Sequence, residues 1–503
     1  RATSNHKVKE TVALELSYVN SNLQLLKEEL EELNSSVDVY QHDRYTQGGL
    51  WIIKICWEGA LRISFSPVFS IQDFIREHYG EEGVLFEKEI KELMELRQAM
   101  RTPSRNEAGL ELLMEYYNQL YFLDSRFFPP NKTLGVFFHW YDSLTGVPSH
   151  QRALAFEKGS VLFNLGALHT QIGARQDRAA LPGLNQAIDA FQKAAGAFNY
   201  LKENFSNAPS LDMSAASLNM LVRLMVAQVQ ECVFEKMTLL RAQNDFLARL
   251  QLAQEAARVE DVYSLVHQTM TQPHVKDYVP FSWTTMVHVK SEHFKALSHY
   301  FAAIALCDCP VASEAELPEQ EKAFMQFHIT MPEGPSLRVL LQDPEERRKL
   351  AQCGGSSCPK SPRSPTVCVF LSPPPAKTHQ KPEIKSPNFS QVKVTDLFHR
   401  LGPLSVFSAK NKWYPARRVH LRRGENGFGF TLRGDSPVLI AGVIPGGCAA
   451  EAGLKEGDYI ISVNGKDCKW SKHAEVVQLL KSTGEEGVEI GVITLQGSEG
   501  PKA

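Results

Sequence analysis

The sequence predicts a mainly α-helical protein that ends in a small β-rich α+β domain. The helical prediction rests on apolar residues that recur with helical spacing between residues 71 and 350. The second prediction rests on short β-rich runs between residues 417 and 496, after a proline-rich stretch. With 503 residues, 43 % of them hydrophobic and 22 % charged, the chain has a globular composition and room for about three folding units.

Charge and cysteine content exclude several classes of protein. Lys and Arg total 54 against 57 Asp and Glu, so an overall nucleic-acid-binding protein is not expected. No apolar run approaches the roughly 18 residues of a transmembrane helix. The nine cysteines lack the paired spacing of a zinc site, so we expect reduced thiols, no metal and no cofactor. The chain starts at Arg1 without a signal peptide, and we expect a fragment of a soluble cytoplasmic protein.

A heptad-like seam marks residues 1–40. Apolar residues alternate in steps of four and three, which predicts one apolar stripe on a helix from about His6 to Asn34. The seam consists of Val12, Leu16, Val19, Leu23, Leu26, Leu30 and Leu33. Two interpretations stay open: the helix docks on the next domain, or it is half of a coiled coil.

Residues 41–70 have a different pattern. Apolar residues alternate from Trp51 to Trp57 and again from Leu61 to Phe65, and Glu58-Gly59 lies between the two runs. This pattern predicts a β-hairpin, and we expect no other sheet before residue 415.

The segment from Ile71 to about Leu350 is expected to be helical throughout. Helical periodicity is clearest over residues 154–172, 184–198, 218–232 and 294–304, in an arrangement like a tetratricopeptide stack. Gly159, Gly166 and Gly173 are seven residues apart and cost helix propensity. We therefore expect a neighbouring helix to approach this stripe closely, which places the first of these helices centrally.

Residues 351–390 are expected to be a disordered linker. Eight prolines lie between Pro359 and Pro387, and four of them follow serine. These patterns allow docking to a proline-recognition domain or phosphorylation, but a solvated linker is the favoured interpretation. Residues 391–408 are expected to connect this linker to the last domain, at 409–497.

The last domain contains a motif that can bind an anion. In Gly427-Phe428-Gly429-Phe430, two glycines flank an aromatic residue just before a predicted strand, so successive backbone N–H groups can turn towards one ligand. No P-loop lysine follows, so the expected anion is a carboxylate. The edge of the strand could then pair with an extended peptide.

This segment resembles a PDZ domain. Gly427 to Phe430 match the carboxylate-binding loop of that family, and Arg423 stands where the family often has a basic residue. The resemblance implies that His473, at the start of the groove helix, selects C termini of the form Ser/Thr-x-hydrophobic. The other residues implied to line the groove and its pocket are Leu432, Val477 and Leu480. The alternative is that His473 is only an exposed residue at a helix start.

Six basic residues without an acid lie between Lys410 and Arg423. An anionic membrane surface could attract such a stretch, which would make the protein peripheral to membranes. A strand edge protected by charge is the favoured interpretation.

The rest of the chain has resemblances too. Residues 163–172 and 225–231 resemble the signature helices of the Bro-type domain of Alix-like proteins, which implies a helical scaffold over 41–350. The N-terminal seam resembles the second helix of a Rho-effector repeat, so that Leu16, Val19, Leu23, Leu26 and Leu30 would belong to a surface for GTP-bound Rho. This order of modules resembles the rhophilin family. Such a protein would be an adaptor that links GTP-bound Rho to cytoskeletal or membrane-associated partners.

Three departures from that family modify the expectation. The first helix of the Rho-binding repeat has no counterpart, so Rho binding is expected to require it. Residues 44–66 differ from the family, and the Bro-type domain has a shortened C-terminal arm. We therefore expect exposed apolar surface and a lower stability than that of the full-length domain.

An adaptor explains the motifs better than an enzyme does. The sequence has no nucleophile elbow, no zinc-protease helix, no Walker loop and no kinase motifs. The resemblance to Alix implies an alternative adaptor, an endosomal-sorting protein whose Bro-type domain binds ESCRT-III subunits.

Overall fold

A computed structural model describes residues 67–130, 134–205, 210–240, 246–307, 382–424, 427–484 and 487–496. The predicted N-terminal helix and the predicted hairpin at 51–65 lie outside these residues. So does the predicted linker up to residue 381.

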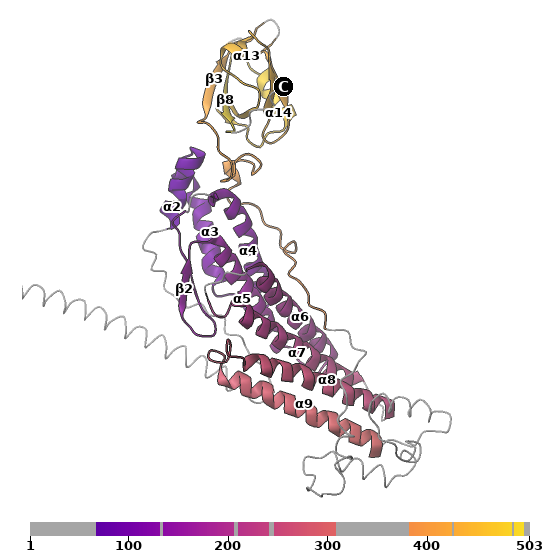
Figure 1. Ribbon diagram of the computed structural model, residues 1–503. Helices are drawn as coiled ribbons and strands as arrows, with labels where there is room; N and C mark the ends of the chain where they lie inside the picture. The colour runs from indigo at the N-terminus through magenta and orange to yellow at the C-terminus, as the bar shows by residue number, and fades with distance from the viewer. Residues whose placement is uncertain are drawn as a thin grey trace, which may run out of the picture. The chain divides into compact units, whose positions relative to one another are not determined.

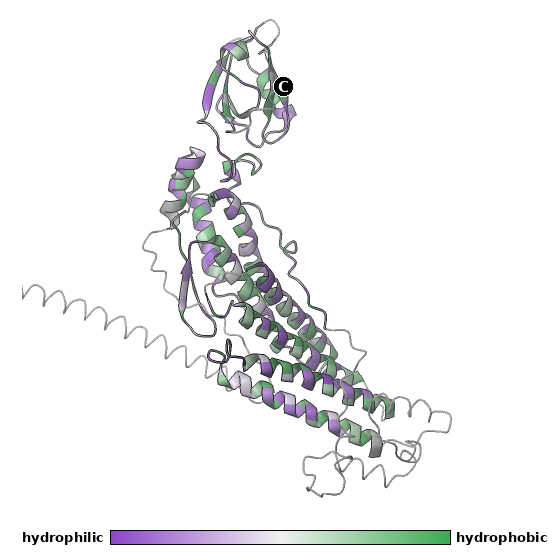
Figure 2. Cartoon of the chain, viewed as in Figure 1, coloured by the Kyte–Doolittle hydropathy of each residue, from purple (hydrophilic) through white to green (hydrophobic). Residues whose placement is uncertain are grey.

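The first part of the described chain is helical, as predicted. Helix α2 (Pro67–Phe74) continues into a π-helical turn (Ile75–Tyr79), and a 3-10 turn (Gly83–Phe86) leads to α3 (Glu87–Met100). The long helices that follow are α4 (Glu107–Phe127), α5 (Leu154–Ala174), α6 (Leu181–Asn204), α7 (Ala215–Leu240), α8 (Phe246–Met270) and α9 (Phe281–Cys307) (Figure 1). From α4 to α9, each helix contacts the next one in the chain. Hydrophobic and hydrophilic residues are mixed along α9 (Figure 2), as expected for a helix with one exposed face.

Helix α5 is central, as the glycine stripe predicted. A Cβ on Gly166 would lie 2.9 Å from Cε1 of Phe198, and one on Gly173 would lie 3.0 Å from Cε1 of Phe191, both residues of α6. A Cβ on Gly159 would lie 2.8 Å from Cε of Met213. The missing side chains therefore make room for these neighbours, which compensates for the poor helix propensity of glycine.

One prediction for this region is wrong. Strands β1 (Phe138–Tyr141) and β2 (Pro148–Gln151) form an antiparallel hairpin between α4 and α5, so the segment is not helical throughout, and a sheet other than the predicted hairpin does precede residue 415. Its register runs from Phe138 opposite Gln151 to Tyr141 opposite Pro148. Each strand has only four residues, and β2 (Pro-Ser-His-Gln) has no apolar alternation from which it could be predicted.

Residues 382–413, here called the return segment, pack against the helical domain. The Lys385 N–H donates to the carbonyl of Gln192 (3.2 Å) on α6, and its ammonium pairs with Asp189 (2.6 Å). On α4, the Asn118 amide donates to the carbonyls of Phe389 (2.9 Å) and Val392 (2.7 Å). Residues 382–390 and 391–408 are thus not a free linker and a connection, as expected, but part of the helical domain.

A buried arginine holds the second half of the return segment. Arg126 of α4 is 1 % exposed, and its guanidinium donates to the Asp396 carboxylate (Nε, 2.9 Å). The same group donates to the carbonyls of Gly402 (2.6 Å) and Phe407 (2.5 Å). One charged side chain therefore satisfies three acceptors that are far from α4 in sequence.

The last domain is a five-stranded antiparallel sheet with a short strand β7 (Lys466–Asp467) beside it. The strand order is β3-β8-β6-β5-β4, and β7 pairs with β6. The strands are β3 (Arg417–Leu421), β4 (Phe430–Arg433), β5 (Leu439–Val443), β6 (Asp458–Val463) and β8 (Val488–Thr494), and the helices are α13 (Cys448–Glu451) and α14 (His473–Lys481). The β-rich runs predicted between residues 417 and 496 are confirmed as strands, and the predicted groove helix does begin at His473. Asn464 and Gly465, a residue pair typical of tight turns, have φ values of +48° and +75° between β6 and β7.

Candidate functional site

The Gly-Phe-Gly-Phe loop has the backbone that its glycines predict. Gly427 and Gly429 have φ values of +88° and +79°, in the left-handed region where a side chain is strained. Gly424 and Gly427 exchange two backbone hydrogen bonds, N–H to O=C, of 2.9 and 3.1 Å. These bonds close the loop directly before β4.

Amide groups in this loop are available to a ligand. The carbonyl of Gly429 accepts a hydrogen bond from the Ile444 N–H (2.9 Å), which fixes the orientation of this part of the loop. The N–H groups of Phe428 and Gly429 donate to no acceptor among the described residues. Unpaired neighbouring N–H groups are the donors that a carboxylate needs. Arg423, the predicted basic residue, is exposed just before the loop.

Strand β4 is at the edge of the sheet, and among the described residues it pairs only with β5. Its inward residues, Phe430 and Leu432, are partly buried against the core of the domain, as is Phe428. Thr431 and Arg433 are exposed. The free edge can therefore pair with an extended peptide by main-chain hydrogen bonds.

Helix α14 is held beside the end of β4. The carboxylate of Asp435, two residues after β4, accepts a hydrogen bond from the N–H of His473, the first residue of α14. The Glu475 carboxylate also accepts from the Lys472 N–H (2.8 Å). Sequence analysis missed Asp435. The only available signal was an Asp in a turn between a strand and the later helix.

The predicted groove residues lie on the two elements that Asp435 joins. His473 is exposed and Val477 is half-buried. Leu480 is in the hydrophobic cluster against which Phe428, Phe430 and Leu432 pack. The structure thus brings Phe428 of the loop and the inward residues of β4 to the same hydrophobic cluster as Leu480 of α14. The seam residues predicted for Rho, Leu16, Val19, Leu23, Leu26 and Leu30, lie outside the described residues.

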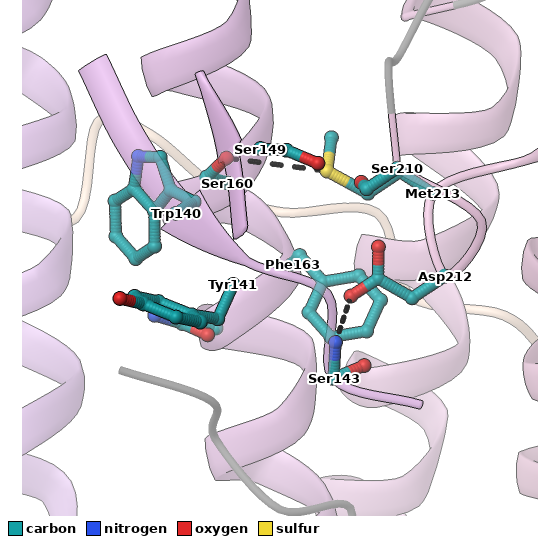
Figure 3. A pocket seen from close by; sticks show the side chains of 10 residues that line it. Trp140, Tyr141, Ser143, Ser149, Ser160, Phe163, Ser210, Asp212 and Met213 are labelled. Carbon is teal, nitrogen blue, oxygen red and sulfur yellow. Dashed lines mark hydrogen bonds between the residues drawn. The ribbon is translucent and has the colours of Figure 1, made fainter. Parts of the chain in front are cut away.

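A small pocket in the helical domain has polar residues but no recognisable chemistry. It is lined by residues of β1, α5 and the loop before α7 (Figure 3). The Asp142 carboxylate accepts from the Asp212 N–H (2.9 Å), and the Asp212 carboxylate accepts from the Ser143 N–H (2.6 Å). Burial and the neighbouring Asp142 raise the pKa of Asp212. These bonds tie the β1–β2 hairpin to the loop before α7, which is a structural role.

Among the described residues, no cluster of three or more His, Cys, Asp or Glu side chains could hold a metal ion. Within the same residues, no helix is both long and apolar enough to cross a membrane.

Comparisons with known proteins agree with the two domains. A BRO1-like domain matches residues 65–316, and a PDZ domain matches residues 418–496. Rhophilin-1 of Homo sapiens is 55 % identical over 98 % of this chain and 79 % of its own length. The chain belongs to the rhophilin family. Rhophilin-2-A of Xenopus laevis is 45 % identical over 99 % of this chain and 78 % of its own length.

Solved structures resemble the separate domains of this rhophilin. The ALIX BRO1 CHMP4C complex is 22 % identical with a TM-score of 0.47, over 70 % of this chain and 96 % of that one. The solution structure of the PDZ domain of mouse Rhophilin-2 is 45 % identical with a TM-score of 0.17, over 19 % of this chain and 85 % of that one. Rhophilins, BRO1-like domains and PDZ domains are binding families rather than enzyme families, so the chain is an adaptor or scaffold.

Proposed function

We propose that this rhophilin is a non-enzymatic adaptor that captures proteins by their C termini through the groove between β4 and α14. The observation that carries the proposal is the loop of Gly427 and Gly429, whose positive φ values leave the N–H groups of Phe428 and Gly429 without a described partner next to a free strand edge. The carboxylate of the peptide would accept from these N–H groups, and the residues before it would extend the sheet.

The same geometry gives each groove residue a role. A peptide whose carboxylate lies at the start of β4 and which pairs with β4 must run antiparallel to it. Its last side chain would enter the apolar pocket of Phe428, Phe430, Val477 and Leu480. The third residue from the end, at position −2, would lie opposite Leu432 and face His473. The imidazole could then accept a hydrogen bond from a Ser or Thr hydroxyl.

The test is binding of fluorescent peptides ending in Thr-Ala-Val to the full chain. We expect amidation of the C terminus to weaken binding at least about tenfold, because the charged acceptor is lost. His473→Ala should weaken binding of this peptide about two- to tenfold and leave a peptide with Ala at position −2 unaffected. His420→Ala is the matched control, since His420 is an exposed histidine on β3, the opposite edge strand. Equal affinity for free and amidated peptides would overturn the proposal.

We further infer that the adaptor serves Rho signalling, linking GTP-bound Rho to cytoskeletal or membrane-associated partners. The name of the relatives, Rhophilin, and the N-terminal seam from Leu16 to Leu30 support this role. The test compares capture by Rho loaded with GTP and with GDP, for this chain and for one extended at its N terminus by a partner helix for the seam. Nucleotide-independent capture, or none by either chain, would contradict it.

The alternative, binding of ESCRT-III subunits by the BRO1-like domain, has less support. The contact residues of Alix-like proteins cannot be matched to named residues of this sequence. Capture of an ESCRT-III C-terminal helix by this chain, with no capture by Rho, would favour the alternative.

A further inference from the structure

Strand β4 separates its side chains into an inner and an outer set. Leu432 is paired with Ile440 of β5, which is fully buried, so these two residues face the core. Arg433 is paired with Leu439, and Thr431 with Gly442. A register shift separates the Thr431 pair from the Leu432 pair, but side chains alternate along β4 itself, and Thr431 and Arg433 are exposed, so both lie on the outer face.

The carboxylate loop fixes the register of a bound peptide, on the basis of the proposed function. If the carboxylate binds the N–H groups of Phe428 and Gly429, the last residue lies opposite Phe430. Counting back along an antiparallel strand places position −1 opposite Thr431, position −2 opposite Leu432 and position −3 opposite Arg433. Successive side chains of a strand point to opposite faces, so the side chain at position −3 lies on the outer face, beside the guanidinium of Arg433.

Arg433 has a charge that the protein itself does not neutralise. It is exposed and forms no ion pair with any residue in the described part of the chain. Its cross-strand neighbour Leu439 is apolar, and Leu439 is paired in turn with Tyr459 of β6. The nearby carboxylate of Asp435 accepts the N–H of His473 and so caps helix α14. The guanidinium of Arg433 therefore lies beside the place that the side chain at position −3 of a bound peptide would occupy.

We propose that Arg433 makes the groove select C termini with Asp or Glu at position −3. Opposite charges directly across two strands stabilise the pair, and the stabilisation corresponds to about a two- to fivefold gain in affinity. The preference depends on an exposed ion pair, so it weakens as salt is added. Position −1 lies opposite Thr431, next to Gly442, where the protein offers no charge.

The experiment measures dissociation constants of the full chain for three acetylated peptides ending in Glu-Thr-Ala-Val, Gln-Thr-Ala-Val and Lys-Thr-Ala-Val. It is done at about 50 mM and 500 mM salt, where the Debye length falls severalfold. The variant is Arg433→Glu, and Arg433→Gln removes the charge without reversing it. Arg418→Glu is the matched control, because it makes the same charge change on β3, at the opposite edge of the sheet.

We expect the wild type and Arg418→Glu to bind the Glu peptide about two- to fivefold more tightly than the Gln peptide, and the Lys peptide most weakly. Arg433→Gln should abolish the ranking, and Arg433→Glu should reverse it, with both effects reduced at high salt. Binding of all three peptides with the same ranking in wild type and Arg433→Glu would overturn this inference but leave the proposed function intact. Failure of every peptide to bind would instead overturn the proposed function, and this inference with it.

Discussion

At the scale of single residues, buried charges in this protein stabilise the fold. Glu231 of α7 receives the guanidinium of Arg178 (2.9 Å), the ammonium of Lys290 (2.7 Å) and the hydroxyl of Tyr263. Burial alone would raise the pKa of Glu231, but Lys290 and Arg178 together lower it to about 2. A carboxylate so fully neutralised is a poor general base, so its role is structural.

These pairs predict how stability depends on pH. The folded pKa of Glu231 lies below its unfolded value, so its contribution is complete above about pH 4.5 and is lost as the pH falls towards 2. Glu231→Gln should lower the free energy of unfolding of the helical domain by about 3–5 kcal/mol at pH 7, because Lys290 loses its partner. The deficit should shrink at pH 3, where the wild type has lost part of the contribution.

Urea unfolding followed by circular dichroism at both pH values measures this effect. The matched control is Glu292→Gln, an exposed carboxylate on α9 whose loss should change stability by less than about 0.5 kcal/mol. A deficit of the same size for both variants would contradict the role assigned to Glu231.

At the scale of elements, the sequence predicted those whose signals are local. Helix α14 begins at His473, as predicted, and the loop and edge strand of the PDZ domain follow from glycine positions and β-rich runs. The close approach of α6 to α5 was predicted from three glycines that are seven residues apart on α5. Each of these signals lies within a few residues of the structure that it determines.

The elements that sequence analysis missed depend on contacts that are distant in the chain. The return segment is held by polar side chains of α4, such as Asn118 and Arg126, about 270 residues before their partners. Its own composition, with Ser386-Pro387, is typical of a linker. The β1–β2 hairpin was missed because its strands are short, and Asp435 because its partner at the start of α14 is 38 residues away.

At the scale of the whole molecule, the return segment changes how the two domains are connected. Sequence analysis expected a long disordered linker to separate them. The Ala409 N–H, however, donates to the carbonyl of Ser125 on α4 (2.7 Å), and β3 of the PDZ domain begins at Arg417. An extended chain of that length spans at most roughly 29 Å. A partner that binds the PDZ groove as proposed would therefore be linked to the helical domain by a short connection.

The central claim is that main-chain amides at the start of β4 hold the terminal carboxylate of a partner. Its most direct test is an NMR titration of the full chain, labelled with ¹⁵N at glycine and phenylalanine, with the Glu-Thr-Ala-Val peptide. We predict that the amide signals of Phe428 and Gly429 shift in a saturable way with the free peptide and stay in place with its amidated form. Signals that stay in place while the free peptide binds, or that shift equally with both forms, would contradict the claim.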